Sequence, residues 1–178
     1  MKNKLSICIS VCLFFVVSGC SIRSSQLSTI IEMVKGTPDD HSDSTWIIRY
    51  GDYRTKVQAL AFEGGTLFSN QQGDQIFFDG WTVTKALGLG MIRGSWSVKD
   101  DIEGRHFTQR NRLTTYPACK PWARTELANL IQYTQACQGS GEYNNSILVS
   151  KQGAITLIRQ SLNGGAGFVT LSKLQARD

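Results

Sequence analysis

The residues best suited to a specific chemical reaction are Val17-Ser18-Gly19-Cys20, near the start of the chain. A branched apolar residue, two small residues and a cysteine match a lipobox, in which small side chains let the backbone enter a peptidase and the thiol accepts diacylglycerol. The apolar stretch 5–17 is too short to cross a hydrocarbon core of roughly 30 Å, but it matches the central region of an export signal. We therefore predict that residues 1–19 are removed and that Cys20 carries acyl chains such as palmitate. An ordinary secretory signal and a retained membrane anchor are the alternatives.

The five cysteines separate by position. Cys8 and Cys12 lie within the predicted signal, and Cys20 is the predicted lipid acceptor. Cys119 and Cys137 remain as one pair in an exported, oxidising setting, which predicts a disulfide; two free buried thiols are the alternative. Closing a loop of this length contributes roughly 3 kcal/mol in the chain-entropy model. The cysteines and the two histidines show no metal-ligand spacing, so we expect no metal site.

No set of residues in the sequence matches a known catalytic arrangement. The serines form no G-x-S-x-G elbow. The acidic residues within 100–103 and the nearby His106 follow no ligand spacing, so we interpret them as a polar loop between strands. The glycine-rich segment 163–167 precedes a predicted strand, whereas a phosphate-binding loop needs a helix N-terminus. We therefore expect a protein that is not an enzyme and uses no cofactor.

The segment 105–124 combines cationic and aromatic side chains and contains no acidic residue. Guanidinium groups pair with carboxylates and phosphates, and aromatic rings can stack on the faces of sugars. This composition predicts a patch for an anionic ligand, either an anionic glycan or a lipid headgroup; a solvated face of alternating strand residues is the alternative. The residues of this predicted patch are Arg105, Arg110, Arg112, Lys120, Trp122 and Arg124.

The charge balance changes once the predicted signal is removed. Two lysines belong to residues 1–19. The remaining chain therefore has 17 of the 19 Lys and Arg residues and all 14 Asp and Glu residues, which gives a net charge of about +3. This modest charge argues against nucleic-acid binding by the protein as a whole. The remaining 159 of the 178 residues suffice for one domain with its own core. No apolar run of transmembrane length follows Cys20, so we expect the acyl chains to hold the protein at a membrane.

Two patterns indicate the elements that position these residues. The segment 24–35 has apolar residues at helical spacing and predicts a short amphipathic helix, and the polar segment 36–44 predicts a connector. From residue 45 onward, short β-prone runs alternate with turn residues. The predicted strands are 46–50, 56–62, 66–69, 75–78, 81–84, 91–99, 106–113, 122–127, 130–137, 146–150, 154–162 and 168–174.

Glycine-containing turns separate several of these runs. Asp79-Gly80 between two β-prone runs predicts a hairpin with a type I′ turn, which needs positive φ at both central positions. The segments 151–153 and 163–165 predict further hairpin turns. Residues 125–135 could form a helix, but their β-branched and aromatic residues favour a strand.

Regularly spaced strands without long helical segments predict an all-β domain, mainly an antiparallel meander. We expect its curved sheet to form a barrel, a half-barrel or a sandwich, preceded by the short N-terminal helix. The predicted organisation is a lipoprotein signal peptide at 1–19, a lipidated N-terminus with helix and linker at 20–44, and a single β domain at 45–178.

The order of these features resembles a known family. Phe68-Ser69 is followed by QIFFDGWTVTKALGL at 75–89, which is similar to a strand–turn–strand segment with an "N-G-r-l-v-k-T-x-G-L" stretch. A strand with a cysteine at 133–137 and the hairpin ILVSKQGAITLIRQSL at 147–162 resemble "f-w-V-d-x-x-G-x-v-r-x-S-r-Q-x-l". Together with the lipobox, these segments resemble the YjbF/GfcB family of outer-membrane lipoproteins. The chain departs from the pattern in that Phe68 stands where a tryptophan is usual.

The resemblance implies a non-enzymatic binding or scaffold protein in exopolysaccharide or group 4 capsule assembly and export. Its implied partners are polysaccharide export proteins or an anionic glycan, and it carries over no catalytic residue. The implied location is the outer membrane, facing the periplasm. Ser21 also favours the outer membrane, because an Asp at this position favours retention in the inner membrane.

Two alternatives come from other functional classes. Apolar residues on both strand faces, as in 76–78 and 155–158, suggest a lipid or lipoprotein carrier with a hydrophobic cavity inside a half-barrel. An enzyme acting on a cell-wall or capsule glycan is the third hypothesis, and no particular pair of carboxylates supports it.

Overall fold

The structure, a computed structural model, describes residues 45–90 and 94–174, and every regular element in these ranges is a β-strand. The first eight strands are β1 (Thr45–Tyr50), β2 (Tyr53–Phe62), β3 (Gly65–Ser69), β4 (Gln75–Phe78), β5 (Val83–Gly88), β6 (Gly94–Asp101), β7 (Gly104–Gln109) and β8 (Arg112–Tyr116). The other five are β9 (Ala123–Glu126), β10 (Leu130–Gln138), β11 (Glu142–Ser150), β12 (Ile155–Ser161) and β13 (Phe168–Lys173). The part of the chain so described contains no helix that could cross a membrane. Cys20, the predicted helix 24–35 and the connector 36–44 lie outside it.

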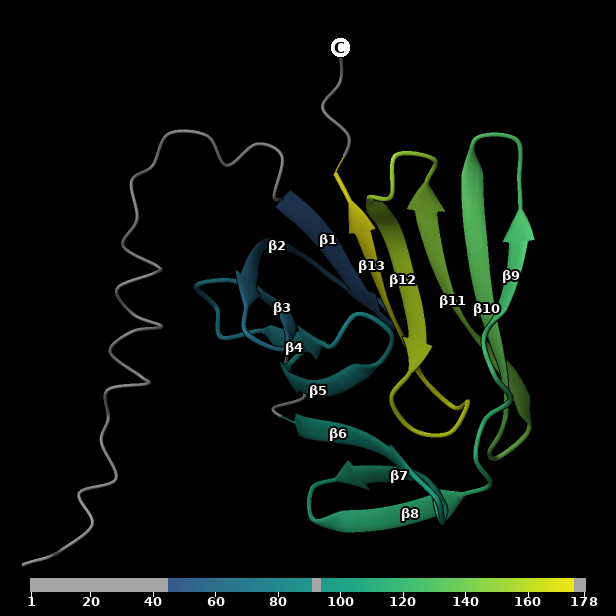
Figure 1. Ribbon diagram of the computed structural model, residues 1–178. Coiled ribbons are helices and arrows are strands. Elements are labelled where there is room, and N and C mark those ends of the chain that lie inside the picture. The colour runs from purple at the N-terminus through teal and green to yellow at the C-terminus, as the bar shows by residue number, and fades with distance from the viewer. Residues whose placement is uncertain (1–44, 91–93, 175–178) are drawn as a thin grey trace, which may run out of the picture. The chain divides into compact units, whose positions relative to one another are not determined.

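All thirteen strands form one antiparallel sheet. Consecutive strands pair from β1 to β8 and again from β9 to β13, and the two series join where β1 pairs with β13, with Trp46 opposite Lys173. The order across the sheet is therefore β8 through β1, then β13 through β9, and the first and last strands of the chain lie side by side within it (Figure 1). The predicted antiparallel meander is confirmed.

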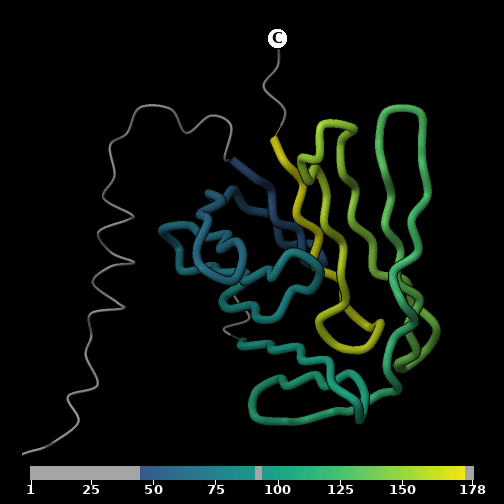
Figure 2. Tube along the Cα trace, in the orientation of Figure 1, coloured from purple at the N-terminus to yellow at the C-terminus, as the bar shows by residue number. Residues whose placement is uncertain are grey.

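The sheet curls into a half-barrel, as the chain trace shows (Figure 2). Side chains alternate between the two faces of each strand, so one face of the curled sheet lines its inside. The main core there is built by large apolar residues, including Trp46, Ile48, Phe68, Ile76, Trp96, Ile147, Ile158 and Leu171. A smaller cluster contains Val98, Phe107, Cys137 and Tyr143. We refer to β2–β8 as the first arm of the sheet and to β9–β12 as the second arm.

The type I′ turn lies in a different hairpin from the predicted one. Arg110 and Asn111 have φ of 47° and 64° and connect β7 to β8 directly, with Gln109 opposite Arg112. Two central residues with positive φ define the type I′ turn. The prediction of one strand over 106–113 is therefore wrong, because these two residues reverse the chain within it.

The loop between β4 and β5 is wider than the predicted two-residue turn. Gly80 has a φ of 105°, whereas Asp79 has no positive φ. The Asp79 carboxylate instead accepts hydrogen bonds from the backbone N–H groups of Trp81 (2.8 Å) and Thr82 (2.6 Å). These N–H groups are therefore unavailable to the sheet, and β5 begins at Val83 rather than at the predicted Trp81.

The segment 125–135 contains parts of two strands and not the alternative helix. β9 and β10 pair with each other, and Leu127 N–H donates to Leu130 O (2.8 Å) across the short turn between them. The glycine-rich segment 163–167 connects β12 to β13 as predicted. In that connection Gly164 has a φ of 69°, and a Cβ built on it would lie 2.3 Å from the Tyr116 ring, so the close approach to this ring requires glycine.

Candidate functional site

Two regions of the half-barrel bring the first arm against the second. The first region, which we call the seam, is centred on Arg105 of β7, whose side chain is 1 % exposed. Arg105 Nη1 donates to Asp100 Oδ2 (3.1 Å) and to Gln135 Oε1 of β10 (3.2 Å). Asn145 of β11 also donates to Gln135 Oε1 (3.1 Å) and accepts from the Ser161 N–H (3.0 Å). The seam therefore joins β7 to β10, β11 and β12 through buried polar groups that bond one another.

The predicted disulfide between Cys119 and Cys137 is present and belongs to the seam. It ties the segment after β8 to β10, and the Lys120 N–H donates to Ala136 O (2.8 Å) beside it. Arg105 Nη1 lies 3.5 Å from Cys119 Sγ. A covalent bond and buried hydrogen bonds thus hold the same junction between the two arms.

The structure does not bring the six residues of the predicted anionic-ligand patch to one surface. Arg105 is buried in the seam and is not accessible to a ligand at the surface, because its side chain reaches Gln135 across the interior. Arg110 and Arg112 lie at the turn of the β7–β8 hairpin, at the opposite end from the connection to β9 (Figure 1).

The second half of the predicted patch has a different setting. Arg124 Nη1 pairs with Glu126 Oε1 at 2.7 Å. Glu126 lies on β9 just beyond the segment 105–124, and its carboxylate neutralises the charge of Arg124. Lys120 is exposed. Trp122 turns inward and packs against the main core, which places it in the second region, described next.

The second region, which we call the mouth, is where the β4–β5 loop reaches the second arm (Figure 1). Gln160 of β12 is fully buried and contacts this loop with both ends of its amide. Its Oε1 accepts from the Val83 N–H (2.8 Å), and its Nε2 donates to Trp81 O (2.5 Å). Together with the Asp79 carboxylate, Gln160 fixes the backbone on both sides of Trp81.

Trp81 presents its ring to two aromatic residues of the second arm. Its centroid lies 5.2 Å from that of Tyr133 with the planes at 86°, and 5.6 Å from that of Trp122 with the planes at 44°. Trp81 is 48 % exposed, whereas Trp122 and Tyr133 are half-buried. These three residues, which we call the aromatic cluster, leave one large ring partly open to solvent on a firmly held loop.

A hollow of about 330 Å³ lies beside the aromatic cluster, within the size range of ligand pockets. We call it the mouth hollow. Its apolar wall comprises Trp81, Ile131, Tyr133, Ile147, Val149 and Ile155. Its polar groups include Ser150 and Lys151, at the end of β11 and in the turn that follows it. The mouth hollow therefore combines an apolar, aromatic wall with a cationic rim.

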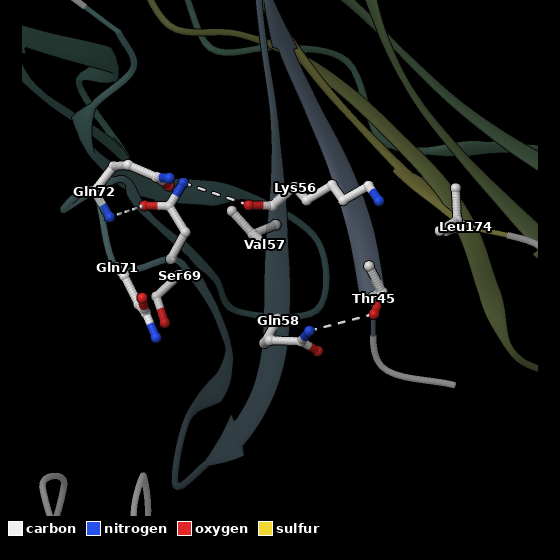
Figure 3. Close-up of a pocket in the computed structure, with 9 residues that line it drawn as sticks. Thr45, Lys56, Val57, Gln58, Ser69, Gln71, Gln72 and Leu174 are labelled. Atoms are coloured by element: carbon white, nitrogen blue, oxygen red, sulfur yellow. Dashed lines mark hydrogen bonds between the residues drawn. The ribbon is translucent and has the colours of Figure 1, made fainter. Parts of the chain in front are cut away.

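A larger hollow of about 580 Å³ lies elsewhere, where β1 and β2 meet the loop after β3 (Figure 3). Its polar groups bond one another: Gln58 donates to Thr45 Oγ1 (3.3 Å), and Asn70 donates to Lys56 O (3.4 Å). None of the described residues that line it is aromatic. The mouth hollow is therefore the better candidate for binding a flat, partly apolar ligand.

The acidic cluster noted in the sequence lies at the β6–β7 turn. His106 Nε2 lies 2.8 Å from Asp101 Oδ1, and the Glu103 N–H donates to the same oxygen (3.0 Å). The bond with His106, followed by that from Glu103, lowers the pKa of Asp101 to about 2. One potential metal-binding atom from each of these three side chains lies within 4.8 Å of the other two. Their bonds stabilise the turn, but only Glu103 lies in the loop between the strands, because β6 extends to Asp101 and β7 includes His106.

Comparison with solved structures shows that this fold is known. The crystal structure of the hypothetical lipoprotein YmcC from Escherichia coli (K12) superposes with a TM-score of 0.52 and 13 % sequence identity, covering 86 % of this chain and 98 % of that one. This chain therefore shares the fold of that protein. No protein-family model matches the sequence, and no curated protein matches it significantly.

The sequence pattern predicts a binding role for Trp122 but for no other residue of the mouth. Trp81 begins the predicted strand 81–84, and Tyr133 lies within the predicted strand 130–137. Lys151 was read as a turn residue. The signal in the sequence is a tryptophan directly after the turn residues Asp79-Gly80, but only the curled sheet brings the β4–β5 loop against β10 and β12.

Proposed function

We propose that this protein is a lipid-anchored, non-enzymatic accessory that binds glycan during exopolysaccharide or capsule assembly and export. The observation that carries the proposal is the aromatic cluster beside an open hollow. The faces of sugar rings bear C–H groups that pack well against aromatic rings, whose faces are electron-rich. A half-exposed tryptophan held by Gln160 and Asp79 loses little conformational entropy when a sugar packs against it.

The proposed location rests on the sequence and on the shared fold. The lipobox at residues 17–20 supports lipidation of Cys20, and the similar structure is that of a hypothetical lipoprotein. Ser21 after the lipidated cysteine supports the outer membrane, and the disulfide is suited to the periplasm. Proposed partners are the membrane, through the acyl chains, and polysaccharide export proteins or the glycan itself.

The lipid-carrier hypothesis receives less support from the described interior. A carrier needs an apolar space deep enough for acyl chains, and the main core between the two arms is occupied by Phe68, Ile76 and Trp96, each at most 2 % exposed. The mouth hollow is apolar but lies at the surface of this core. It suits a ring laid against its wall better than a long chain inserted into it.

A genetic complementation experiment in the source organism tests the proposed function. Deleting the gene should reduce secreted polysaccharide, and the full-length wild-type chain should restore it. We expect the double variant Trp81→Ala/Trp122→Ala, expressed at the wild-type level, to fail to restore secretion. Phe62→Ala is the matched control, because Phe62 is 43 % exposed, close to the 48 % of Trp81, but lies at the end of β2. Unchanged secretion in the deletion strain would contradict the proposal.

A further inference from the structure

The mouth hollow has an unbalanced charge. Lys151 is the only charged side chain among the described residues that line it. No described acidic side chain lies within ion-pair distance of Lys151, whereas Arg124 nearby on β9 is paired with Glu126 at 2.7 Å. A cation without a counter-ion beside an apolar wall attracts an anionic group that arrives with its own apolar surface.

The shape of the wall restricts the apolar part of such a ligand. The rings of Trp81 and Tyr133 meet at 86° with centroids 5.2 Å apart, so they form a corner rather than a flat platform. A six-membered sugar ring packed on one face of this corner presents its edge to the other. A carboxylate on that ring extends outward from its edge, where a cation among the lining residues can pair with it.

The corner is fixed before any ligand arrives. Gln160 and Asp79 hold the backbone of Trp81, and Tyr133 is held in β10 between β9 and β11. Lys151 lies in the β11–β12 turn, which is closed by a hydrogen bond from the Ser150 N–H to Ala154 O (2.8 Å). Aromatic wall and cation therefore belong to three segments with fixed positions.

We propose that the mouth hollow binds an acidic sugar residue, a uronic acid of a polysaccharide, with its ring against Trp81 and Tyr133 and its carboxylate paired with Lys151. This inference rests on the proposed function and names the class of glycan. The anion selectivity comes from one lysine at the mouth and not from the arginine-rich segment 105–124, because none of the cations of that segment lines the mouth hollow.

Calorimetric titration of the purified protein with two matched probes tests the inference. The probes are a β-1,4-linked hexamer of glucuronic acid and the corresponding hexamer of glucose, which differ in their carboxylates. We expect the wild type to bind the uronic acid hexamer about five-fold more tightly at low salt, with this preference declining as salt screens the pair. Lys151→Met should bring the ratio close to one, and Trp81→Ala should weaken binding of both probes.

Lys120→Met is the matched control, because Lys120 is an exposed lysine of the predicted patch that does not line the mouth hollow. It should retain the wild-type preference, and an equal loss in both lysine variants would overturn the inference. Equal wild-type affinity for the two hexamers, weakened by Trp81→Ala, would overturn the acidic-sugar inference and leave glycan binding intact. Binding of dodecanoate at the mouth with no binding of either hexamer would overturn both proposals and favour an acyl carrier.

Discussion

The seam and the mouth join the same two arms of the sheet, but they do so with opposite kinds of side chain. At the seam, Arg105 and Asn145 converge on Gln135, and their groups bond one another out of contact with solvent. At the mouth, one buried glutamine holds a loop whose tryptophan remains 48 % exposed. Burying a polar group lowers the stability of a fold unless the group is hydrogen-bonded, and exposed apolar patches mark binding sites.

This contrast indicates that the seam serves stability and the mouth serves binding. The buried hydrogen bonds of the seam connect the two arms and so stabilise the closure of the half-barrel, while Nε and Nη2 of Arg105 make no hydrogen bond. The mouth uses Gln160 to maintain a surface that the protein itself does not cover. Changes at the seam should therefore affect stability, whereas changes to the ring of Trp81 should affect binding.

The largest expected effect is that of removing the disulfide at the seam. In the double variant Cys119→Ser/Cys137→Ser the unfolded chain gains loop entropy, and the free energy of unfolding should fall by about 3 kcal/mol. Urea denaturation measures this change. The affinity for the uronic acid hexamer, measured where the variant is folded, should equal that of the wild type. A loss of affinity in the folded variant would show that the two regions are coupled.

Gln160→Ala should have a smaller effect, but it should lower both the stability of the protein and its affinity for the hexamers. The Val83 N–H and the Trp81 carbonyl lose their buried partner, which should lower the free energy of unfolding by about 2 kcal/mol. Because the loop that carries Trp81 is then less fixed, affinity for the hexamers should fall as well. Gln152→Ala, which removes an exposed glutamine from the β11–β12 turn, should change neither quantity. A stability loss without any loss of affinity would argue against the positioning role of Gln160.

The smallest expected effect on the free energy of unfolding concerns the partly buried pair of Asp101 and His106 on the first arm. His106 lowers the pKa of Asp101 to about 2. The hydrogen bond between the two side chains therefore contributes fully to stability above the ordinary carboxyl pKa of about 4, and this contribution is lost as the pH falls through about 2. In His106→Asn, NMR titration of the Asp101 carboxyl should give a pKa closer to the ordinary value. An unchanged pKa would assign the shift to the Glu103 N–H instead.

The sequence was sufficient for the class of fold but not for the position of every turn. Alternating apolar residues and regularly spaced turn residues predicted the antiparallel meander, since both are local properties of the chain. Asp79-Gly80 was a misleading signal, because the Asp79 side chain caps two N–H groups and opens a wider loop. Arg110-Asn111 forms the type I′ turn although neither residue is glycine.

The candidate site was less accessible to sequence reasoning because its contacts are long-range. The disulfide was predicted from the number of cysteines and the compartment. Arg105 looked like a surface cation until the curled sheet placed Gln135 beside it. Trp81 and Gln160 are 79 positions apart, and no local pattern indicates that they meet.

The central pairing of β1 with β13 has a consequence for the order in which the protein folds. Each arm can form from hairpins between neighbouring segments, which close short loops and therefore form quickly. The contact of Trp46 with Lys173 joins the two ends of the described domain, so it carries the largest entropic cost of closure. Until the final strand is available, β1 presents an unpaired edge to other chains. This half-barrel is therefore most exposed to misassembly just before its last six-residue strand takes its place.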